Sequence, residues 1–285
     1  MGPKSSMKLL FWNCQGMGNP LTVHNLKGIC RSHSPEVMFL SETKNENGKV
    51  KGWLKKCRFL NTEMVEPIGR AGGLALAWKE NISISDMVCD SFFISCTIND
   101  VVDGYFFHFI GIYASTDANN RRSQFQRLEG VIDTMRGRIV IGGDFNTILY
   151  NHEKKGGIEV EEANMQDFRD FIFSNQLADL GLSGYKYTWS NKWRNGGGIC
   201  ERLDRVIANL EWQAAFPNGL VSHLNGQGSD HLSILLDSTP NNQKAKKRFC
   251  FDAIKKYQTV SAIDGTLLEP LSSEQTSTPC SMHMG

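Results

Sequence analysis

The segment at 137–146, GRIVIGGDFN, constrains the fold of this chain more than any other stretch. The β-branched residues from Ile139 to Ile141 are typical of a strand that is buried on both faces. Two glycines follow, and their lack of side chains lets another group approach the backbone closely. Polar residues begin at once, with Asp144 and Asn146 spaced to share one side of an extended chain. A carboxylate that takes a proton would then lie beside an amide that holds an oxyanion. The same segment is also compatible with a Gly-Asp turn whose hydrogen bonds are purely structural.

Length and composition narrow the class of protein. A chain of 285 residues suits one large α/β domain or two small ones. The hydrophobic content of 40% and charged content of 21% are ordinary for a globular protein, and the net charge of +1 argues against a globally basic nucleic-acid binder. Eight scattered cysteines without zinc-type spacing indicate reduced, mostly buried thiols in a cytosolic or nuclear protein. Without a secretory signal or a membrane-spanning run, we expect no membrane association.

Other predicted strands also end in polar residues. The apolar run at 8–14 contains Asn13 near its end, and the run at 36–40 is followed by Glu42. Because both residues come at the carboxyl ends of strands, we expect them to converge on one rim of a sheet. A series of antiparallel strands is predicted between 72 and 113, and Tyr113 ends the last of them. A tyrosine in such a position more often serves packing than catalysis.

The second half of the chain adds an aromatic segment and a basic loop. Tyr185, Tyr187 and Trp189 alternate before a glycine-rich loop that carries Lys192 and Arg194. Exposed aromatic residues beside these cations would stack on unpaired bases or enter a DNA groove. A strand with one packed face and a flexible hairpin explains the same pattern equally well.

Two further acidic positions need partners. Asp204 interrupts the apolar run at 201–208, and an unpaired buried aspartate is costly, so it requires a partner such as a histidine. Asp230 and His231 lie at the start of another buried strand. A histidine with an acidic neighbour can be held in one orientation and charged to face a phosphate.

Oxygen donors dominate the polar residues at strand ends, which favours magnesium or manganese over zinc. These residues are Asn13, Glu42, Asp144, Asn146, Asp204, Asp230 and His231. Together they indicate phosphoryl chemistry with a metal, an activated water and a cationic histidine. Neither a Gly-x-Ser-x-Gly motif nor a Walker loop is present, which disfavours a serine hydrolase and a nucleotide-driven machine.

Five ordered motifs resemble those of the endonuclease/exonuclease/phosphatase superfamily, which includes deoxyribonuclease I and the apurinic/apyrimidinic endonucleases. The motifs are WNCQG at 12–16, LSET at 40–43, GGDFN at 142–146, RLDR at 202–205 and SDH at 229–231. The intervening residues, such as RAGGLALAW at 70–78 and YTWSN at 187–191, are more similar still to the endonuclease domain of plant LINE-type (non-LTR) retrotransposons. The resemblance covers residues 8–237.

This resemblance implies a deoxyribonuclease I-like fold. The α/β chain would form a four-layer α/β sandwich, in which two packed mixed β-sheets are flanked by helices. Residues 1–7 would be an N-terminal extension and 8–237 the catalytic domain. Residues 238–285 would be a flexible C-terminal tail, the remnant of a linker toward a missing reverse transcriptase.

The resemblance also assigns roles to the site residues. Glu42 resembles the principal ligand of Mg²⁺ or Mn²⁺, with Asn13 and Asp230 assisting. Asp144 resembles the residue that orients or deprotonates the attacking water, and Asn146 the residue that holds this water and the phosphate.

The remaining motif residues would act on the phosphate. Tyr113 resembles a phosphate-contacting tyrosine, and His231, oriented by Asp204, would bind the scissile phosphate or stabilise its developing charge. In-line attack on DNA would release a 3′-hydroxyl and a 5′-phosphate. Ser233, where the family often has proline, and the loop at 114–116, which lacks the usual glycine, depart from the family pattern.

The sequence is therefore compatible with three functions. The first is a metal-dependent DNA endonuclease of retrotransposon origin, which we expect to be a nuclear or cytoplasmic monomer. The second is a phosphatase or phosphodiesterase of the same superfamily with a substrate other than DNA. The third is a catalytically silent fragment that only binds nucleic acid.

Overall fold

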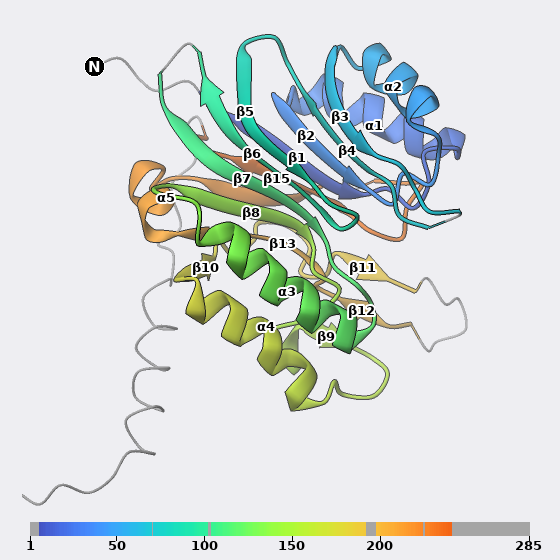
Figure 1. Ribbon diagram of the computed structural model, residues 1–285. Coiled ribbons are helices and arrows are strands. Elements are labelled where there is room, and N and C mark those ends of the chain that lie inside the picture. Colours follow the sequence, from blue (N-terminus) through green and yellow to red (C-terminus); the bar gives the residue numbers. More distant parts are fainter. Residues whose placement is uncertain (1–5, 70, 102–103, 192–197, 225, 241–285) are drawn as a thin grey trace, which may run out of the picture. The chain divides into compact units, whose positions relative to one another are not determined.

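Two six-stranded β-sheets lie face to face in the computed structural model, with helices on their outer faces (Figure 1). The structure describes residues 6–69, 71–101, 104–191, 198–224 and 226–240. This arrangement confirms the four-layer α/β sandwich that the motifs implied. No helix in these ranges is long and apolar enough to cross a membrane.

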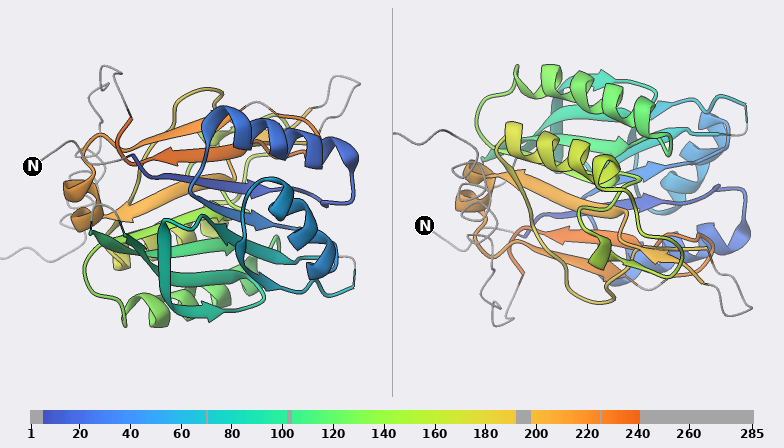
Figure 2. Two further views of the ribbon diagram at one scale, coloured as in Figure 1. Left: turned by 90° about the horizontal axis from the view of Figure 1, so that it is seen from above. Right: turned by 90° about the horizontal axis from the view of Figure 1, so that it is seen from below.

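The first sheet has the strand order β14-β15-β1-β2-β4-β3. Its strands are β1 (Lys8–Asn13), β2 (Val37–Ser41), β3 (Asn61–Val65), β4 (Leu74–Trp78), β14 (Leu220–Leu224) and β15 (Ser233–Asp237). β1 and β2 run parallel, and the other neighbours are antiparallel. Helices α1 (Pro20–His33) and α2 (Asn47–Lys56) cover its outer face (Figure 2).

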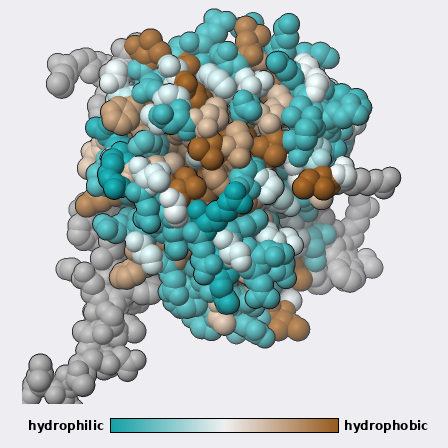
Figure 3. All heavy atoms as spheres, viewed as in Figure 1, coloured by the Kyte–Doolittle hydropathy of each residue, from teal (hydrophilic) through white to brown (hydrophobic). Residues whose placement is uncertain are grey.

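The second sheet repeats this plan with the order β10-β13-β8-β7-β6-β5. Its strands are β5 (Ile82–Cys89), β6 (Phe93–Asp100), β7 (Phe106–Tyr113), β8 (Ile139–Asp144), β10 (Leu177–Asp179) and β13 (Asp204–Asn209). Here β7 and β8 are the parallel pair. Helices α3 (Ala118–Ile132) and α4 (Glu162–Ser174) cover this sheet, and the surface over them is largely hydrophilic (Figure 3).

Short elements complete the described chain. A small third sheet joins β11 (Trp189–Ser190), β12 (Cys200–Glu201) and β9 (Lys154–Lys155), which follows the 3₁₀ turn η1 (Asn151–Glu153). Helix α5 (Leu210–Ala215) follows β13. The alternating aromatic residues at 185–189 do not form the strand that one reading of the sequence predicted, because only the last of them enters β11.

The main core lies between the two sheets, where aromatic rings pack on glycine backbone. The Phe11 and Phe109 rings stack with centroids 5.6 Å apart. A Cβ added to Gly142 would lie 2.6 Å from the Phe11 ring, and one added to Gly111 would lie 2.3 Å from the ring of Phe39. The close approach that the glycines of 137–146 indicated is therefore made by Phe11 from the opposite sheet.

Strand β8 continues through both glycines to Asp144, so these glycines lie within the strand. Its register places Asp144 opposite Tyr113 of β7 and Asp204 of β13. In the other sheet, Asn13 at the end of β1 pairs with Ser41 at the end of β2. The polar ends of these strands meet at one edge of the sandwich.

The domain boundaries expected at residues 8 and 237 stay a prediction. Just outside them, Met7 and Ser238 are buried and bonded to each other, with Met7 N donating to Ser238 Oγ at 2.9 Å and Ser238 N to Met7 O at 2.9 Å. Most of the expected tail, from 241 onward, lies outside the described residues. The six cysteines in the described part are free thiols, and three of them, Cys14, Cys57 and Cys96, are buried.

Candidate active site

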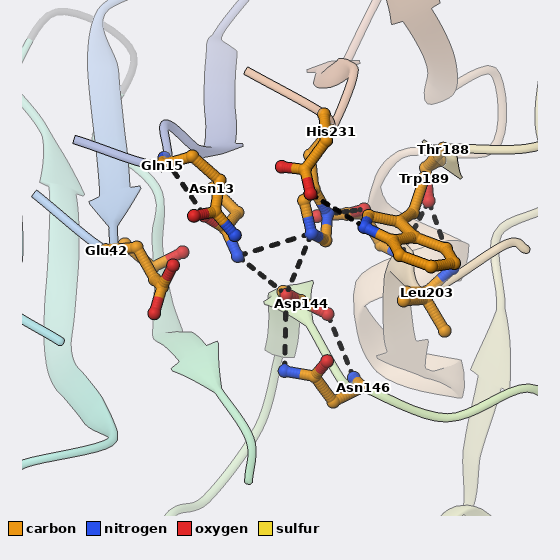
Figure 4. A network of polar contacts seen from close by, with 12 residues as sticks. Asn13, Gln15, Glu42, Asp144, Asn146, Thr188, Trp189, Leu203 and His231 are labelled. Atoms are coloured by element: carbon orange, nitrogen blue, oxygen red, sulfur yellow. Dashed lines mark hydrogen bonds and ion pairs between the residues drawn. The ribbon is translucent and has the colours of Figure 1, made fainter. Parts of the chain in front are cut away.

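Asp144 occupies the centre of a network of polar contacts at this edge (Figure 4). Its side chain is buried, and Asp144 Oδ2 accepts a hydrogen bond of 2.9 Å from Asn13 Nδ2. His231 Nε2 lies 3.8 Å from the same oxygen. Burial raises the pKa of Asp144 to about 6, because desolvation disfavours the charged form, and the charge of His231 limits this rise. Asp144 is therefore ionised at neutral pH but remains a better base than an ordinary aspartate.

Asn146 reaches Asp144 through a tight turn and not through the extended chain that its spacing suggested. Its backbone is left-handed, with φ 48°, and Asn146 N donates to Asp144 Oδ1 at 2.9 Å. Asn146 Nδ2 lies 3.3 Å from Asp144 Oδ2 and donates to Ala114 O at 2.7 Å. Both readings of this segment thus hold in part: the turn exists, and it also turns the Asn146 amide toward the carboxylate.

His231 is the partner that the buried Asp204 required. His231 Nδ1 donates to Asp204 Oδ2 at 2.9 Å, and both side chains are buried. Burial by itself lowers the pKa of His231, but the negative charges of Asp204 and Asp144 outweigh it and raise the pKa to about 9. The imidazole is thus a protonated cation between two carboxylates at neutral pH.

Glu42 lies beside this group, just beyond the end of β2. Tyr113 Oη donates to Glu42 Oε1 at 2.6 Å, and Lys44 Nζ lies 2.9 Å from Glu42 Oε2. Lys44 Nζ also donates to Gln15 Oε1 at 2.6 Å. Burial and the hydrogen bond to Glu42 raise the pKa of Tyr113 above its usual range, so its hydroxyl stays a donor.

Several residues near the strand ends of the site have strained backbone conformations. Gln15, Glu42, Lys44 and Asn146 all adopt left-handed backbone conformations, with φ between 47° and 52°. Such conformations cost energy in residues other than glycine and persist where the surrounding structure holds them. Lys44 links Gln15 and Glu42, whereas the Asn146 side chain contacts Asp144 and Ala114.

Asp230 is tied to the aromatic segment that precedes β12. Trp189 Nε1 donates to Asp230 Oδ2 at 2.9 Å, whereas the buried Asp230 Oδ1 has no hydrogen-bond partner in the described part of the chain. Trp189 is half-buried and packs near Leu203. Its expected contact with DNA stays a prediction, and Lys192 and Arg194 lie outside the described residues.

Several residues that support the site were not singled out from the sequence. Thr188 Oγ1 accepts hydrogen bonds from Leu203 N and Asp204 N at 3.0 Å and 2.9 Å. Ser229 Oγ donates to Asn13 O at 2.7 Å and accepts from His231 N at 3.0 Å. These hydroxyls sit in the quoted motifs, but only the fold shows that they connect separate strands.

The two arginines of the RLDR motif do not join the site. Arg205 is fully buried and forms ion pairs of 2.8 Å with Glu153 and Asp179, and Arg202 pairs with Glu153 at 3.1 Å. Adjacent residues of a strand face opposite sides, so Arg205 of β13 points away from Asp204, and Arg202, which precedes β13, is held by its ion pairs with Glu153 and Asp179. The motif thus combines one residue of the site with two anchors of the strand that carries it.

A sequence profile described as the endonuclease/exonuclease/phosphatase family matches residues 10–231. The chain belongs to this family. No match is found among curated protein sequences. The match spans every site residue discussed above, from Asn13 to His231.

Solved structures of other proteins share the fold at low sequence identity. The 3′-5′ exonuclease NExo from Neisseria meningitidis is 17% identical with a TM-score of 0.64, covering 81% of this chain and 98% of its own. An AP endonuclease from Archaeoglobus fulgidus is 16% identical with a TM-score of 0.63, and coverage is 81% and 98%. The endonuclease domain of TRAS1, a telomere-specific non-LTR retrotransposon, is 14% identical with a TM-score of 0.59, covering 84% of this chain and 100% of its own.

Members of this family depend on a divalent metal, and the donor set of this chain fits one. Tyr113 Oη contacts the Glu42 carboxylate directly, and the negative charges of Asp144 and Asp230 also raise the pKa of Tyr113. The unpartnered Asp230 Oδ1 is an oxygen donor still available in this group. Carboxylate and amide oxygens suit Mg²⁺ or Mn²⁺.

A second acidic cluster lies next to this donor set. Ligand atoms of Asp144, Asp204 and His231 lie within 4.8 Å of one another, which is also compatible with a metal. We favour the oxygens around Glu42 as the metal site, because the protonated imidazole of His231 already supplies the cation between Asp144 and Asp204.

Proposed function

We propose that this chain is a metal-dependent DNA endonuclease that hydrolyses a phosphodiester bond and leaves a 3′-hydroxyl and a 5′-phosphate. The observation that carries the proposal is the pairing of Asp144 with His231. The two groups lie 3.8 Å apart with pKa values of about 6 and about 9. At a pH between these two values, the Asp144 carboxylate is ionised and can act as a base, and the His231 imidazole is protonated and carries a positive charge. The hydrolysis of a phosphodiester requires both.

Asp144 is the general base of this proposal. Its carboxylate accepts hydrogen bonds from Asn13 Nδ2 and Asn146 N, which fix its orientation. A water held by Asp144 and the Asn146 amide gives up its proton to this carboxylate as it attacks phosphorus. The raised pKa of Asp144 favours this transfer near neutral pH.

His231 is the group that stabilises charge on the phosphate. Its Nδ1 proton is held by Asp204, so the ring is fixed with Nε2 directed at the centre of the site. A protonated Nε2 donates to a phosphate oxygen on which negative charge develops. Asp204 acts as a positioning residue in this scheme, because it orients and charges His231.

Glu42 is the proposed principal metal ligand, with Asn13 and Asp230 assisting. A bound Mg²⁺ or Mn²⁺ supplies neutralisation of charge on the phosphate oxygens. Tyr113 holds Glu42 Oε1 and would contact the phosphate from the same position. Lys44 pairs with the other oxygen of Glu42, so this cation has to yield to the metal or share the carboxylate with it.

Similar proteins support DNA as the substrate. The structural relatives include an AP endonuclease and a retrotransposon endonuclease domain, and a Neisseria NExo structure described as a 3′ phosphatase is bound to a product DNA hairpin. The motifs at 70–78 and 187–191 support an origin in a plant LINE-type element. A monomer in the nucleus or cytoplasm fits this origin, and Trp189, Lys192 and Arg194 are the proposed DNA contacts.

Nicking of supercoiled plasmid tests the proposal. The purified chain is incubated with Mg²⁺, with Mn²⁺ or with EDTA, next to Asp144→Asn, His231→Gln and a control, Asp167→Asn, which removes only a surface ion pair with Arg122. We expect the wild-type chain to nick plasmid only when metal is present. The nicking rate should fall by about 10²-fold or more in Asp144→Asn and His231→Gln and stay unchanged in the control. Extension of the nick by a DNA polymerase without prior treatment identifies a 3′-hydroxyl.

The other functions predict different outcomes. A folded protein that binds metal but leaves plasmid intact, and releases phosphate from phosphomonoesters, would be a family phosphatase. A chain that binds DNA without any hydrolysis would be the silent fragment.

A further inference from the structure

A hollow of about 450 Å³ lies at the end of the first sheet that is opposite to the active site. Its walls come from the second half of α1 and the residues after it, from the end of α2 and the residues after it, and from Lys79, which follows β4. Lys79 N donates to Glu36 O at 3.0 Å, just before β2, whereas Glu42 follows the end of that strand. A strand rises by about 3.3 Å per residue, so the hollow and Glu42 are separated by roughly 20 Å.

Five cations line this hollow, and no carboxylate does. They are Lys27, Arg31, Lys56, Arg58 and Lys79. None of the five forms an ion pair with a carboxylate within the part of the chain that the structure describes. The carboxyl ends of α1 and α2 each contribute a charge of only about −0.5, and the Glu36 carboxylate interacts with Lys79, so these groups together still leave most of the positive charge uncompensated. Such a concentration is notable in a chain with a net charge of +1.

The cations enter the hollow from several elements. Lys27 lies in α1 well before its last turn, Arg58 lies beyond the end of α2, and Lys79 lies beyond β4. Stabilisation of a helix end explains basic residues in a last turn, but it does not explain these three. Lys27 and Lys79 are also half-buried, and Lys79 Nζ lies 6.0 Å from the centroid of the Phe59 ring, which belongs to the same lining.

Two thiols, those of Cys30 and Cys57, line the hollow, and their pKa values are sensitive to the charges around it. Cys57 is buried, and Cys30 beside it is half-buried. The pKa of the Cys57 thiol is lowered, first by its hydrogen bond with Cys30 and further by the charges of Lys27 and Arg31. The pKa of the Cys30 thiol is raised by the same hydrogen bond and by burial, so only the effect of Lys27 and Arg31 on Cys57 reflects the positive charge of the hollow.

We propose that this hollow binds a compact polyphosphate, such as the triphosphate group of a nucleotide. Its volume falls within the range of small-molecule sites, and ammonium and guanidinium groups are the donors that bind phosphate oxygens best. A compact anion reaches the half-buried Lys27 and Lys79 together, whereas a duplex would meet chiefly the exposed Arg31, Lys56 and Arg58. The site is independent of the proposed nuclease chemistry.

Binding of inorganic tripolyphosphate to the full chain is the first test. Isothermal titration at constant ionic strength and without divalent metal compares wild type with Lys27→Gln/Lys79→Gln. The matched control is Lys51→Gln/Lys155→Gln, which removes the same charge from two exposed lysines outside the hollow. We expect at least tenfold weaker binding for the first variant and unchanged binding for the control. Equal affinities for the three proteins, or no binding to wild type, would overturn the proposal.

Alkylation of cysteines provides a second readout that does not depend on a variant. Iodoacetamide labelling followed by mass spectrometry compares Cys30, which lines the hollow, with the exposed Cys89 outside it. Tripolyphosphate is expected to slow the labelling of Cys30 and to leave Cys89 unchanged. Protection of Cys30 by duplex DNA but not by tripolyphosphate would show a nucleic-acid surface and refute a compact-anion site.

Discussion

The Tyr113 hydroxyl donates a hydrogen bond of 2.6 Å to Glu42 Oε1 and so joins the two sheets at their shared edge. Tyr113 ends β7 of the second sheet, and Glu42 follows β2 of the first. Two further contacts of the site, Asn13 to Asp144 and His231 to Asp204, also cross between the sheets. The packing of one sheet on the other therefore fixes the geometry of the site.

The Tyr113–Glu42 contact predicts a selective defect. Tyr113→Phe removes the hydroxyl, and Glu42 Oε1 loses its donor without loss of the ring. We expect the nicking rate to fall by about 10-fold to 10²-fold, with a change of about 1 kcal/mol in the free energy of unfolding. Nicking kinetics and urea denaturation measure the two effects. A large loss of stability would mean that the contact serves the fold and not the chemistry.

Removal of the Asp204 charge should change the titration of His231. Asp204→Asn eliminates the carboxylate that raises the pKa of His231, so this pKa should fall below about 9. NMR titration of the imidazole measures the shift directly. We also expect the alkaline limb of the pH–rate profile to move to lower pH. The same substitution at the surface residue Asp167 should leave both curves in place, and an unshifted imidazole in Asp204→Asn would contradict the assignment.

Nicking should follow a bell-shaped pH dependence. Asp144 has to lose its proton, with a pKa of about 6, and His231 has to keep its proton, with a pKa of about 9. Activity is therefore expected to rise through pH 6 and to fall through pH 9. Measurement of kcat/KM on a short duplex defines both limbs. A profile that is flat across this range would argue against the acid–base pair.

The same histidine should make stability depend on pH. The pKa of His231 in the folded chain lies above its ordinary value of 6.5, so the folded state binds this proton more tightly than the unfolded state. Its contribution is complete below pH 6.5 and is lost as the pH rises through about 9. We expect Tm to fall over this window and His231→Gln to reduce that fall. An equal fall in the variant would assign the effect to other groups.

The metal site can be examined without catalysis. Addition of Mg²⁺ or Mn²⁺ should raise Tm, because a ligand that binds only the folded state stabilises it. Glu42→Gln should remove most of this rise, whereas Glu66→Gln, a substitution at a surface position, should keep it. Calorimetric titration with Mn²⁺ gives the affinities. Undiminished binding by Glu42→Gln would move the site toward Asp144 and Asp204.

Packing of Phe11 on Gly142 predicts a steric effect at the centre of the sandwich. Gly142→Ala places a methyl group 2.6 Å from the Phe11 ring, and we expect a loss of about 1–3 kcal/mol. Gly130→Ala, in helix α3 with open space around it, should instead stabilise by about 0.5–1 kcal/mol. Chemical denaturation compares the two variants. Partial rescue of Gly142→Ala by Phe11→Leu would identify the clash as the cause.

The sequence determined which residue types end the strands, and the five motifs identified the family and its four-layer fold. These features are local: apolar runs and glycine pairs are set by neighbours along the chain. The motif order also named the polar residues that the structure brings together, including the partner that Asp204 needed.

Only the tertiary structure decided how these residues meet. The hydrogen bonds of Asn146 Nδ2 to Ala114 O and of Lys44 Nζ to Gln15 Oε1, and the hydroxyl links of Thr188 and Ser229, join segments far apart in the chain. The pKa values of Asp144 and His231 likewise follow from burial and from charges on other strands. Distances across two packed sheets are set by the whole core, and no single stretch of sequence encodes them.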